Sequence, residues 1–115
     1  MKVHLHSDVF DIVKVGDKNV EARLYDEKRK QLKVGDTLVF LRRPLEEDRI
    51  VAKVTDLVRY KTFSELVEHY EMKRLYLEGY TKEMYLNEMS RFYTLEEQLV
   101  DGVLAIHFEV LDDEA

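Results

Sequence analysis

Cysteine is absent from this sequence, and proline occurs only once. Without cysteine the chain has no disulfide framework, no thiolate metal site and no cysteine nucleophile, which suits a reducing compartment. No stretch approaches the roughly 18 uninterrupted apolar residues of a membrane-spanning helix, and the start of the chain lacks the apolar segment of a signal peptide. We therefore expect a cytoplasmic protein that does not enter a membrane.

The size of the chain limits it to one folded unit. A chain of 115 residues, 45% of them hydrophobic, can bury one ordinary core and is too short for two self-sufficient domains. No internal repeat, linker or low-complexity stretch divides it. We expect residues 1–115 to form a single domain.

The charge is unevenly distributed along the chain. The net charge of −6 argues against a protein that coats nucleic acid, because phosphate binding depends on clustered Lys and Arg. However, residues 14–43 carry nine basic and five acidic side chains, whereas residues 44–115 carry eight basic and seventeen acidic ones. This asymmetry indicates either a basic face for an anionic ligand or a solvated hairpin whose charges serve solubility.

Alternation of polar and apolar residues predicts strands, and apolar residues at helical spacing after a capping residue predict helices. Two segments rich in β-branched residues, 37–43 and 49–60, are separated by a short polar stretch, so we expect an antiparallel hairpin. Thr62 and Glu65 have the spacing of a capping box, and we expect one helix from there to Gly79. The other expected elements are strands at 2–6, 19–24 and 102–111, helices after Ser7 or Asp8 and after Thr81, and a short turn after Thr94.

This order of elements indicates an α+β fold. A mixed sheet of about five to six strands most simply curls into a small β-barrel with helices covering its ends. The last four residues, 112–115, are expected to fray.

One segment carries a recognisable motif. Residues 16–23 have the sequence Gly-Asp-Lys-Asn-Val-Glu-Ala-Arg, and Val-Gly-Asp at 34–36 precedes the next expected strand. This resembles the signature of the ASCH family, Gly-x-Lys-x-x-Glu-x-Arg followed by Gly-Asp before a strand. The resemblance implies a PUA-like barrel and an RNA- or nucleotide-binding module.

Some small bacterial ASCH proteins are amidohydrolases that remove the acetyl group from 4-acetylcytidine. They use a lysine, a threonine three residues later, and a glutamate before a later helix. By resemblance the lysine is Lys18 and the glutamate is Glu78, whereas the threonine position holds Glu21, so the hydroxyl nucleophile is missing. An enzyme of this kind would be metal-independent, with Glu21 or Glu78 as general base for a water and Lys18 polarising the amide carbonyl.

The motif also has a chemical interpretation of its own. Side chains alternate along a strand, so Glu21 and Arg23 share a face opposite Val20, Ala22 and Leu24. Arg23 can then hold an anion or a base edge while Glu21 accepts a hydrogen bond from an amino group. Lys18, which we expect near the surface, offers an ammonium to a phosphate or carbonyl oxygen. The structural alternative is an internal ion-pair set that fixes the barrel mouth.

Further residues are candidates for the same site. Arg42 and Arg43 could extend a phosphate track, although at the end of a hairpin strand such residues are often merely solvated. Tyr80, beside Gly79, is the tyrosine we expect at the cleft, where it could stack on a base. His4 and His6 share a strand face, but no third ligand has recognisable spacing, so we expect no metal and no cofactor.

Together these patterns predict an RNA- or modified-nucleoside-binding domain whose partner is RNA, a nucleoside or a nucleotide. Two alternatives remain open. One is an amidohydrolase that deacylates a nucleobase, and the other is a protein-interaction domain without a small ligand.

Overall fold

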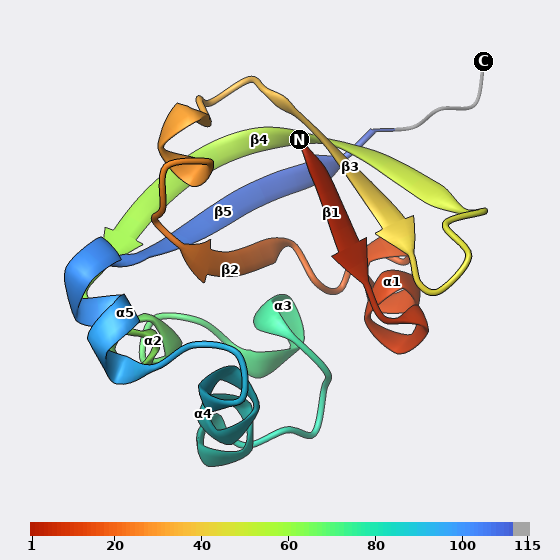
Figure 1. Cartoon of the computed structure of the whole chain (residues 1–115). Coiled ribbons are helices and arrows are strands. Elements are labelled where there is room, and N and C mark those ends of the chain that lie inside the picture. The colour runs from red at the N-terminus through yellow and green to blue at the C-terminus, as the bar shows by residue number, and fades with distance from the viewer. Residues whose placement is uncertain (112–115) are drawn as a thin grey trace.

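In the computed structural model, residues 1–111 are described, so the expected fraying of residues 112–115 lies outside the described part of the chain. The elements follow the expected order, in which four strands and one helix precede a run of helices and a last strand closes the chain (Figure 1). The strands are β1 (Lys2–Leu5), β2 (Val20–Leu24), β3 (Thr37–Arg42), β4 (Arg49–Tyr60) and β5 (Val103–Val110). The helices are α1 (Ser7–Lys14), α2 (Phe63–Val67), α3 (Met72–Leu75), α4 (Lys82–Ser90) and α5 (Leu95–Asp101), with a short 3-10 turn at Arg29–Gln31.

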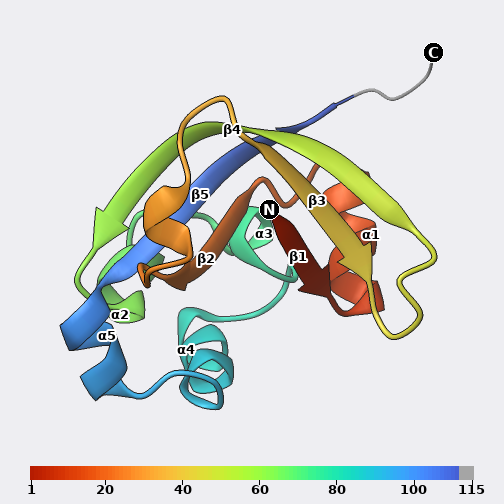
Figure 2. The ribbon, with the colours of Figure 1, turned by 45° about the horizontal axis from the view of Figure 1, so that its top comes forward.

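The five strands form one curled sheet in the order β1-β3-β4-β5-β2. β1 and β3 run parallel, and the other neighbouring strands are antiparallel. The curl brings the two edge strands, β1 and β2, toward each other as a half-barrel (Figures 1 and 2). We call the opening between these two edges the seam. The predicted α+β fold with a PUA-like curled sheet is confirmed.

The central hairpin follows the prediction. β3 pairs with β4 from Thr37 opposite Lys53 to Leu41 opposite Arg49. β4 then continues along β5 with a register shift between Val54 and Asp56. A bulge of this kind increases the local twist and helps a sheet to curl. The long strand β4 can therefore bend with the sheet while it pairs with β3 on one side and β5 on the other.

Helices cover the sheet on two sides. α1 packs against β3, while α2, α3 and α5 contact β2, β4 or β5. The core beneath α1 includes Phe40 and Phe108, whose ring centroids lie 4.8 Å apart. The core beneath the later helices includes Phe63, Leu66 and Tyr85, all of them almost fully buried.

The single helix expected from Thr62 to Gly79 is wrong. It is divided into α2 and α3, with a break around Tyr70. The Tyr70 hydroxyl makes a hydrogen bond of 2.6 Å to His107 Nε2 and accepts another from the Tyr60 hydroxyl at 3.1 Å. These bonds to the sheet draw the chain out of the helix, so tertiary contacts override the helical spacing.

The two later helices, α4 and α5, begin at side-chain caps. Thr81 Oγ1 accepts from the N–H of Met84 and starts α4 where expected. Thr94 and Glu97 form a complete capping box, and it is followed by the seven-residue helix α5 instead of the short turn that we expected. Within residues 1–111, no helix combines the length and apolar character needed to cross a lipid bilayer.

Candidate functional site

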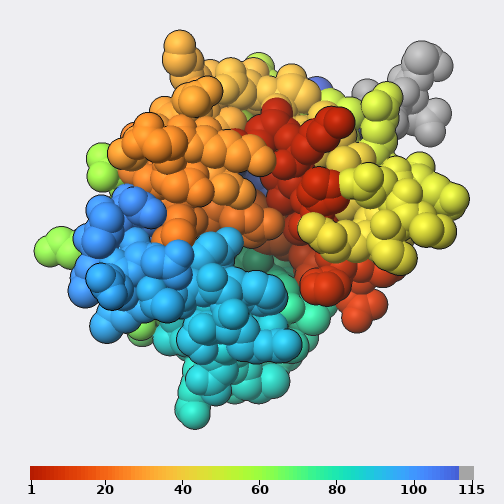
Figure 3. All heavy atoms as spheres, viewed as in Figure 1, coloured from red at the N-terminus to blue at the C-terminus, as the bar shows by residue number. Residues whose placement is uncertain are grey.

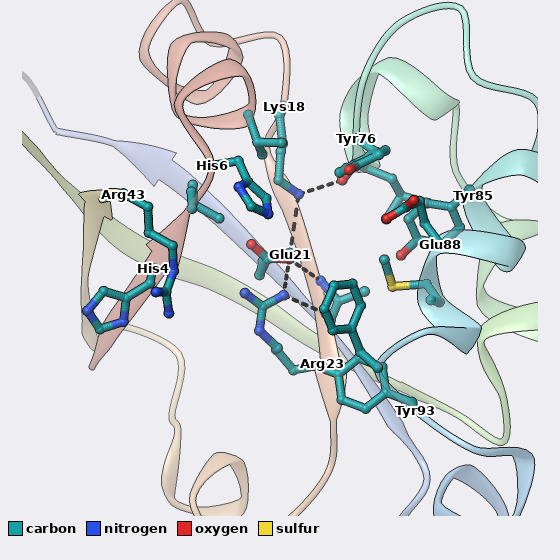
Figure 4. A pocket seen from close by; sticks show the side chains of 16 residues that line it. His4, His6, Lys18, Glu21, Arg23, Arg43, Tyr76, Tyr85, Glu88 and Tyr93 are labelled. Atoms are coloured by element: carbon teal, nitrogen blue, oxygen red, sulfur yellow. Dashed lines mark hydrogen bonds and ion pairs between the residues drawn. The ribbon is translucent and has the colours of Figure 1, made fainter. Parts of the chain in front are cut away.

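A pocket of about 470 Å³ occupies the seam. Figure 3 shows it as a hollow between the atoms of β1 and β2, in red and orange, and those around α4, in cyan. The β1 side contributes His4, His6 and Arg43. The β2 side contributes Lys18, Glu21 and Arg23. The helical side is mainly aromatic, with Tyr76, Tyr85, Phe92 and Tyr93 (Figure 4).

Lys18 lies in the interior, with 1% of its surface exposed, so the expectation that it lies near the surface is wrong. α1 ends at Lys14, and two residues later Gly16 has a φ of +90°, which suits glycine. The N–H groups of Asp17 and Lys18 then both donate to Ile12 O, which turns the chain inward. Lys18 Nζ donates to Val20 O and to Leu75 O, both at 2.5 Å, and lies 3.7 Å from Glu21 Oε1.

Leu75 O reaches Lys18 because α3 is tied to the residue after Lys18. The N–H of Asn19 donates to Arg74 O at 3.1 Å, and Arg74 Nε donates back to Asn19 Oδ1 at 2.8 Å. This reciprocal pair fixes the end of α3 over the start of β2. The burial of Lys18 therefore depends on a partner 57 positions away in the sequence.

Glu21 is also buried, with 5% exposure. Its Oε1 accepts from Arg23 Nη1 at 2.7 Å and from the N–H of Ala22 at 3.0 Å. Its second carboxylate oxygen, Oε2, is buried and has no hydrogen-bond partner within residues 1–111. As the β alternation predicted, Glu21 and Arg23 share the pocket face while Val20, Ala22 and Leu24 are buried on the other.

The ionic cluster of Lys18, Glu21 and Arg23 also caps the edge of the sheet. Within residues 1–111, β2 pairs only with β5, so its outer backbone groups have no strand partner in that part of the chain. Val20 O accepts from Lys18, the N–H of Ala22 donates to Glu21, and Ala22 O accepts from Arg23. Side chains thus take the place of a further strand, because a buried backbone group without a partner is costly.

The three charges of the ionic cluster perturb one another. Burial lowers the pKa of Lys18 to about 8, a decrease that the Glu21 carboxylate only partly offsets. Burial alone would raise the pKa of Glu21, but Arg23 and Lys18 outweigh it and hold this pKa below its ordinary value. Burial also opposes the charge of Arg23, yet Glu21 raises the pKa of Arg23. Lys18 is the member closest to releasing its proton at neutral pH.

Two of the candidate residues lie elsewhere. Glu78 is exposed in the loop between α3 and α4 and does not line the pocket. Tyr80 lines a separate hollow together with residues 68–72 and packs its ring against Tyr76, with centroids 5.0 Å apart. We expected Glu78 and Tyr80 beside Lys18, but the structure places neither residue in the pocket that contains Lys18.

The paired arginines separate in the structure. Arg42 is bound on both sides, with Nη2 at 2.8 Å from Asp11 Oδ1 and Nε at 3.0 Å from Asp48 Oδ2. Arg43 lines the pocket with His4 and His6. Across residues 1–111, no group of three His, Asp or Glu side chains is arranged to hold a metal ion.

The sequence also held a signal that we did not use. Tyr85, Glu88, Met89 and Phe92 are spaced at i, i+3, i+4 and i+7, so they share one face of α4 and its C-terminal turn. All four line the pocket. Glu88, half-buried and paired with Arg91 at 2.9 Å, is thus the second pocket carboxylate.

The ASCH domain profile matches residues 3–111, which include the whole ionic cluster. The chain belongs to the ASCH domain family. No protein among the curated proteins is a significant match.

Solved structures share the fold. The hypothetical protein PH0355 is 29% identical with a TM-score of 0.81, and the match covers 96% of this chain and 100% of that one. PF0455 from Pyrococcus furiosus is 27% identical with a TM-score of 0.72, covering 97% and 99%. A serine-to-alanine mutant of ZmASCH from Zymomonas mobilis is 13% identical with a TM-score of 0.66, covering 94% and 66%. At that identity the likeness to ZmASCH concerns the fold alone.

Proposed function

We propose that this ASCH domain binds a nucleobase, belonging to RNA or to a modified nucleoside, in the seam pocket. A volume of about 470 Å³ lies within the usual range of small-ligand sites, about 300–1,000 Å³. The pocket combines a charged floor with an aromatic wall. Nucleobases need this combination, because they present hydrogen-bonding edges and flat apolar faces.

The observation that carries the proposal is the unpaired Oε2 of Glu21. The pKa of Glu21 is held below its ordinary value, so this oxygen belongs to a carboxylate, which accepts hydrogen bonds and donates none. A buried acceptor without a donor is costly, and the amino group of a base would satisfy it. The guanidinium of Arg23, which also faces the cavity (Figure 4), can donate to a carbonyl oxygen on the same base edge.

Lys18 supports binding in a less direct way. Its ammonium is engaged with two backbone carbonyl oxygens and lies close to Glu21. In this proposal Lys18 stabilises the ionised form of Glu21 and fixes its position, while Glu21 and Arg23 contact the ligand.

Stacking gives a test that leaves the ionic cluster untouched. Phe92 lines the pocket yet is 60% exposed, so its removal should hardly affect the fold. We expect Phe92→Ala to weaken nucleoside binding about tenfold, because stacking on an aromatic ring contributes about 1–3 kcal/mol per base. Calorimetric titration with the four common nucleosides and a modified one would measure this effect.

The matched control is Leu99→Ala. Leu99 is 64% exposed on α5 and lies outside the pocket. The Leu99→Ala substitution should leave the affinity for nucleosides unchanged. If the parent and Phe92→Ala bound nucleosides with equal affinity, the proposed stacking of a base on Phe92 would be wrong.

An amidohydrolase acting on an acylated nucleobase such as 4-acetylcytidine is the second candidate. In its favour, Lys18 has a pKa of about 8 and the pocket holds a second carboxylate, Glu88. Glu88 would then replace Glu78 as the partner of Lys18 and Glu21. Against it, two of the three N–H donors of Lys18 already bind backbone carbonyl oxygens, and the Glu21 carboxylate at 3.7 Å competes for the third.

The two candidates are separated by incubating the protein with a panel of acylated nucleosides. Release of free acid by the parent, but not by Glu88→Gln, would favour hydrolysis. Binding without release would favour the binding module.

A further inference from the structure

The sheet side of the seam pocket, formed by residues on or next to β1 and β2, is cationic, although the chain as a whole has a net charge of −6. Lys18 and Arg23 share one carboxylate, that of Glu21, which leaves one positive charge in excess. Arg43 adds another. Since a cleft with low-dielectric walls concentrates its own field, this pocket favours a ligand with a negative group.

The remaining pocket carboxylate does not cancel this excess. Glu88 Oε1 lies 2.9 Å from Arg91 Nη1. Glu88 also lies on the helical side of the pocket, across from Arg43 (Figure 4). The excess positive charge therefore lies on the sheet side of the pocket, where Arg43 beside the end of β1 is its exposed member.

Arg43 is held at this position by its backbone. Its N–H donates to Leu5 O at 2.8 Å, which fixes it beside the end of β1. Its guanidinium makes no ion pair or hydrogen bond with residues 1–111, whereas the neighbouring Arg42 is bound to Asp11 and Asp48. The pocket thus holds an arginine whose five donors are free for a ligand.

His6 lies on the same side. It is exposed, lines the pocket and makes no hydrogen bond through its ring to residues 1–111. His4, in contrast, contacts the Glu46 carboxylate through Nε2. In either neutral tautomer one ring nitrogen of His6 is a donor, so Arg43 and His6 both offer donors to the pocket.

We propose that Arg43 and His6 form a phosphate subsite, so that the pocket binds a nucleotide and not merely a nucleoside. This inference rests on the proposed function, since it assumes that the base lies against Glu21 and the aromatic wall. The guanidinium fork matches two phosphate oxygens, and His6 can donate to a third. The phosphate belongs either to a free nucleotide or to the end of an RNA strand.

The test compares ligands that differ only in phosphate. Each nucleoside, its 5′-monophosphate and its 3′-monophosphate are titrated into the parent, Arg43→Ala and Arg49→Ala, together with inorganic phosphate alone. Trinucleotides with and without a 5′-phosphate distinguish an RNA end from a free nucleotide. Arg49 is the control because it is exposed in the same hairpin and lies outside the pocket. Unchanged melting temperatures would show that the variants are folded.

We expect one monophosphate to bind the parent roughly tenfold to a hundredfold more tightly than its nucleoside, because hydrogen bonds to charged groups are strong. Arg43→Ala should abolish this preference by lowering monophosphate affinity to that of the nucleoside, and Arg49→Ala should retain it. Nucleoside binding without a phosphate preference, or a preference that survives Arg43→Ala, would refute the subsite and leave the base pocket intact. If neither nucleosides nor nucleotides bind, the proposed function fails and the subsite with it.

Discussion

Replacing Glu21 with alanine is expected to lower the free energy of unfolding by about 3–5 kcal/mol, the usual cost of removing one partner from a buried charge pair. The substitution leaves Lys18 and Arg23 buried without their shared carboxylate. It also removes the acceptor of the Ala22 N–H at the edge of β2. Urea denaturation at neutral pH, followed by circular dichroism, would measure the change.

Glu88→Ala is the matched control for this prediction. Glu88 also lines the pocket, but its ion-pair partner Arg91 is largely exposed, and pairs at the surface contribute about 0–1 kcal/mol. If Glu21→Ala and Glu88→Ala were equally stable, the claim that the buried ionic cluster stabilises the fold would be wrong.

The ionisation of Lys18 should make the stability of the parent rise in mild alkali, relative to Lys18→Met. Burial lowers the pKa of Lys18 from 10.5 to about 8 in the folded chain. Between these values the folded chain has released a proton that the unfolded chain still holds, so stability increases with pH. We expect the free energy of unfolding of the parent, minus that of Lys18→Met, to grow by about 2 kcal/mol between about pH 8 and pH 10.

This difference is measured by urea denaturation of both proteins across that range of pH. Other titrating groups are common to the two chains, so their contributions largely cancel in the difference. The neutral amine retains two N–H donors, enough for Val20 O and Leu75 O. A difference that stays flat or falls with rising pH would mean that the folded chain keeps the Lys18 ammonium protonated.

Local patterns in the sequence predicted much of the fold. Alternation along residues 19–24 placed Glu21 and Arg23 on one face, and the hydroxyl cap at Thr81 placed the start of α4 correctly. The capping box at Thr94 was also recognised, although a short turn was expected there instead of α5. These features depend on neighbours within a few residues, so the sequence shows them directly.

The errors concern contacts between distant segments. Lys18 is buried because Leu75 O, from another element, meets its ammonium. The helix after Thr62 breaks because Tyr70 bonds to His107 on β5. The path of the loop before α4 decides that Glu88 reaches the pocket and Glu78 does not. Secondary-structure propensity and residue spacing describe only near neighbours in the sequence, so they do not reveal partners from distant segments.

In the proposed function one motif, the ionic cluster, serves both structure and binding. Lys18, Glu21 and Arg23 use part of their hydrogen-bonding capacity to cap the open edge of β2. What remains faces the pocket, namely Glu21 Oε2 and part of the Arg23 guanidinium. Substitutions in the cluster will therefore affect stability and binding together, which is why Phe92 and Arg43 are the cleaner probes.

The most direct test of the central claim is a nuclear magnetic resonance titration of the labelled protein with nucleosides and nucleoside monophosphates. If the seam pocket is the base-binding site, the largest chemical-shift changes will fall on the backbone amides of residues 4–6, 18–23 and 92–93, which surround it. Changes concentrated on residues 68–72, around the separate hollow, or no changes at millimolar ligand, would contradict the account.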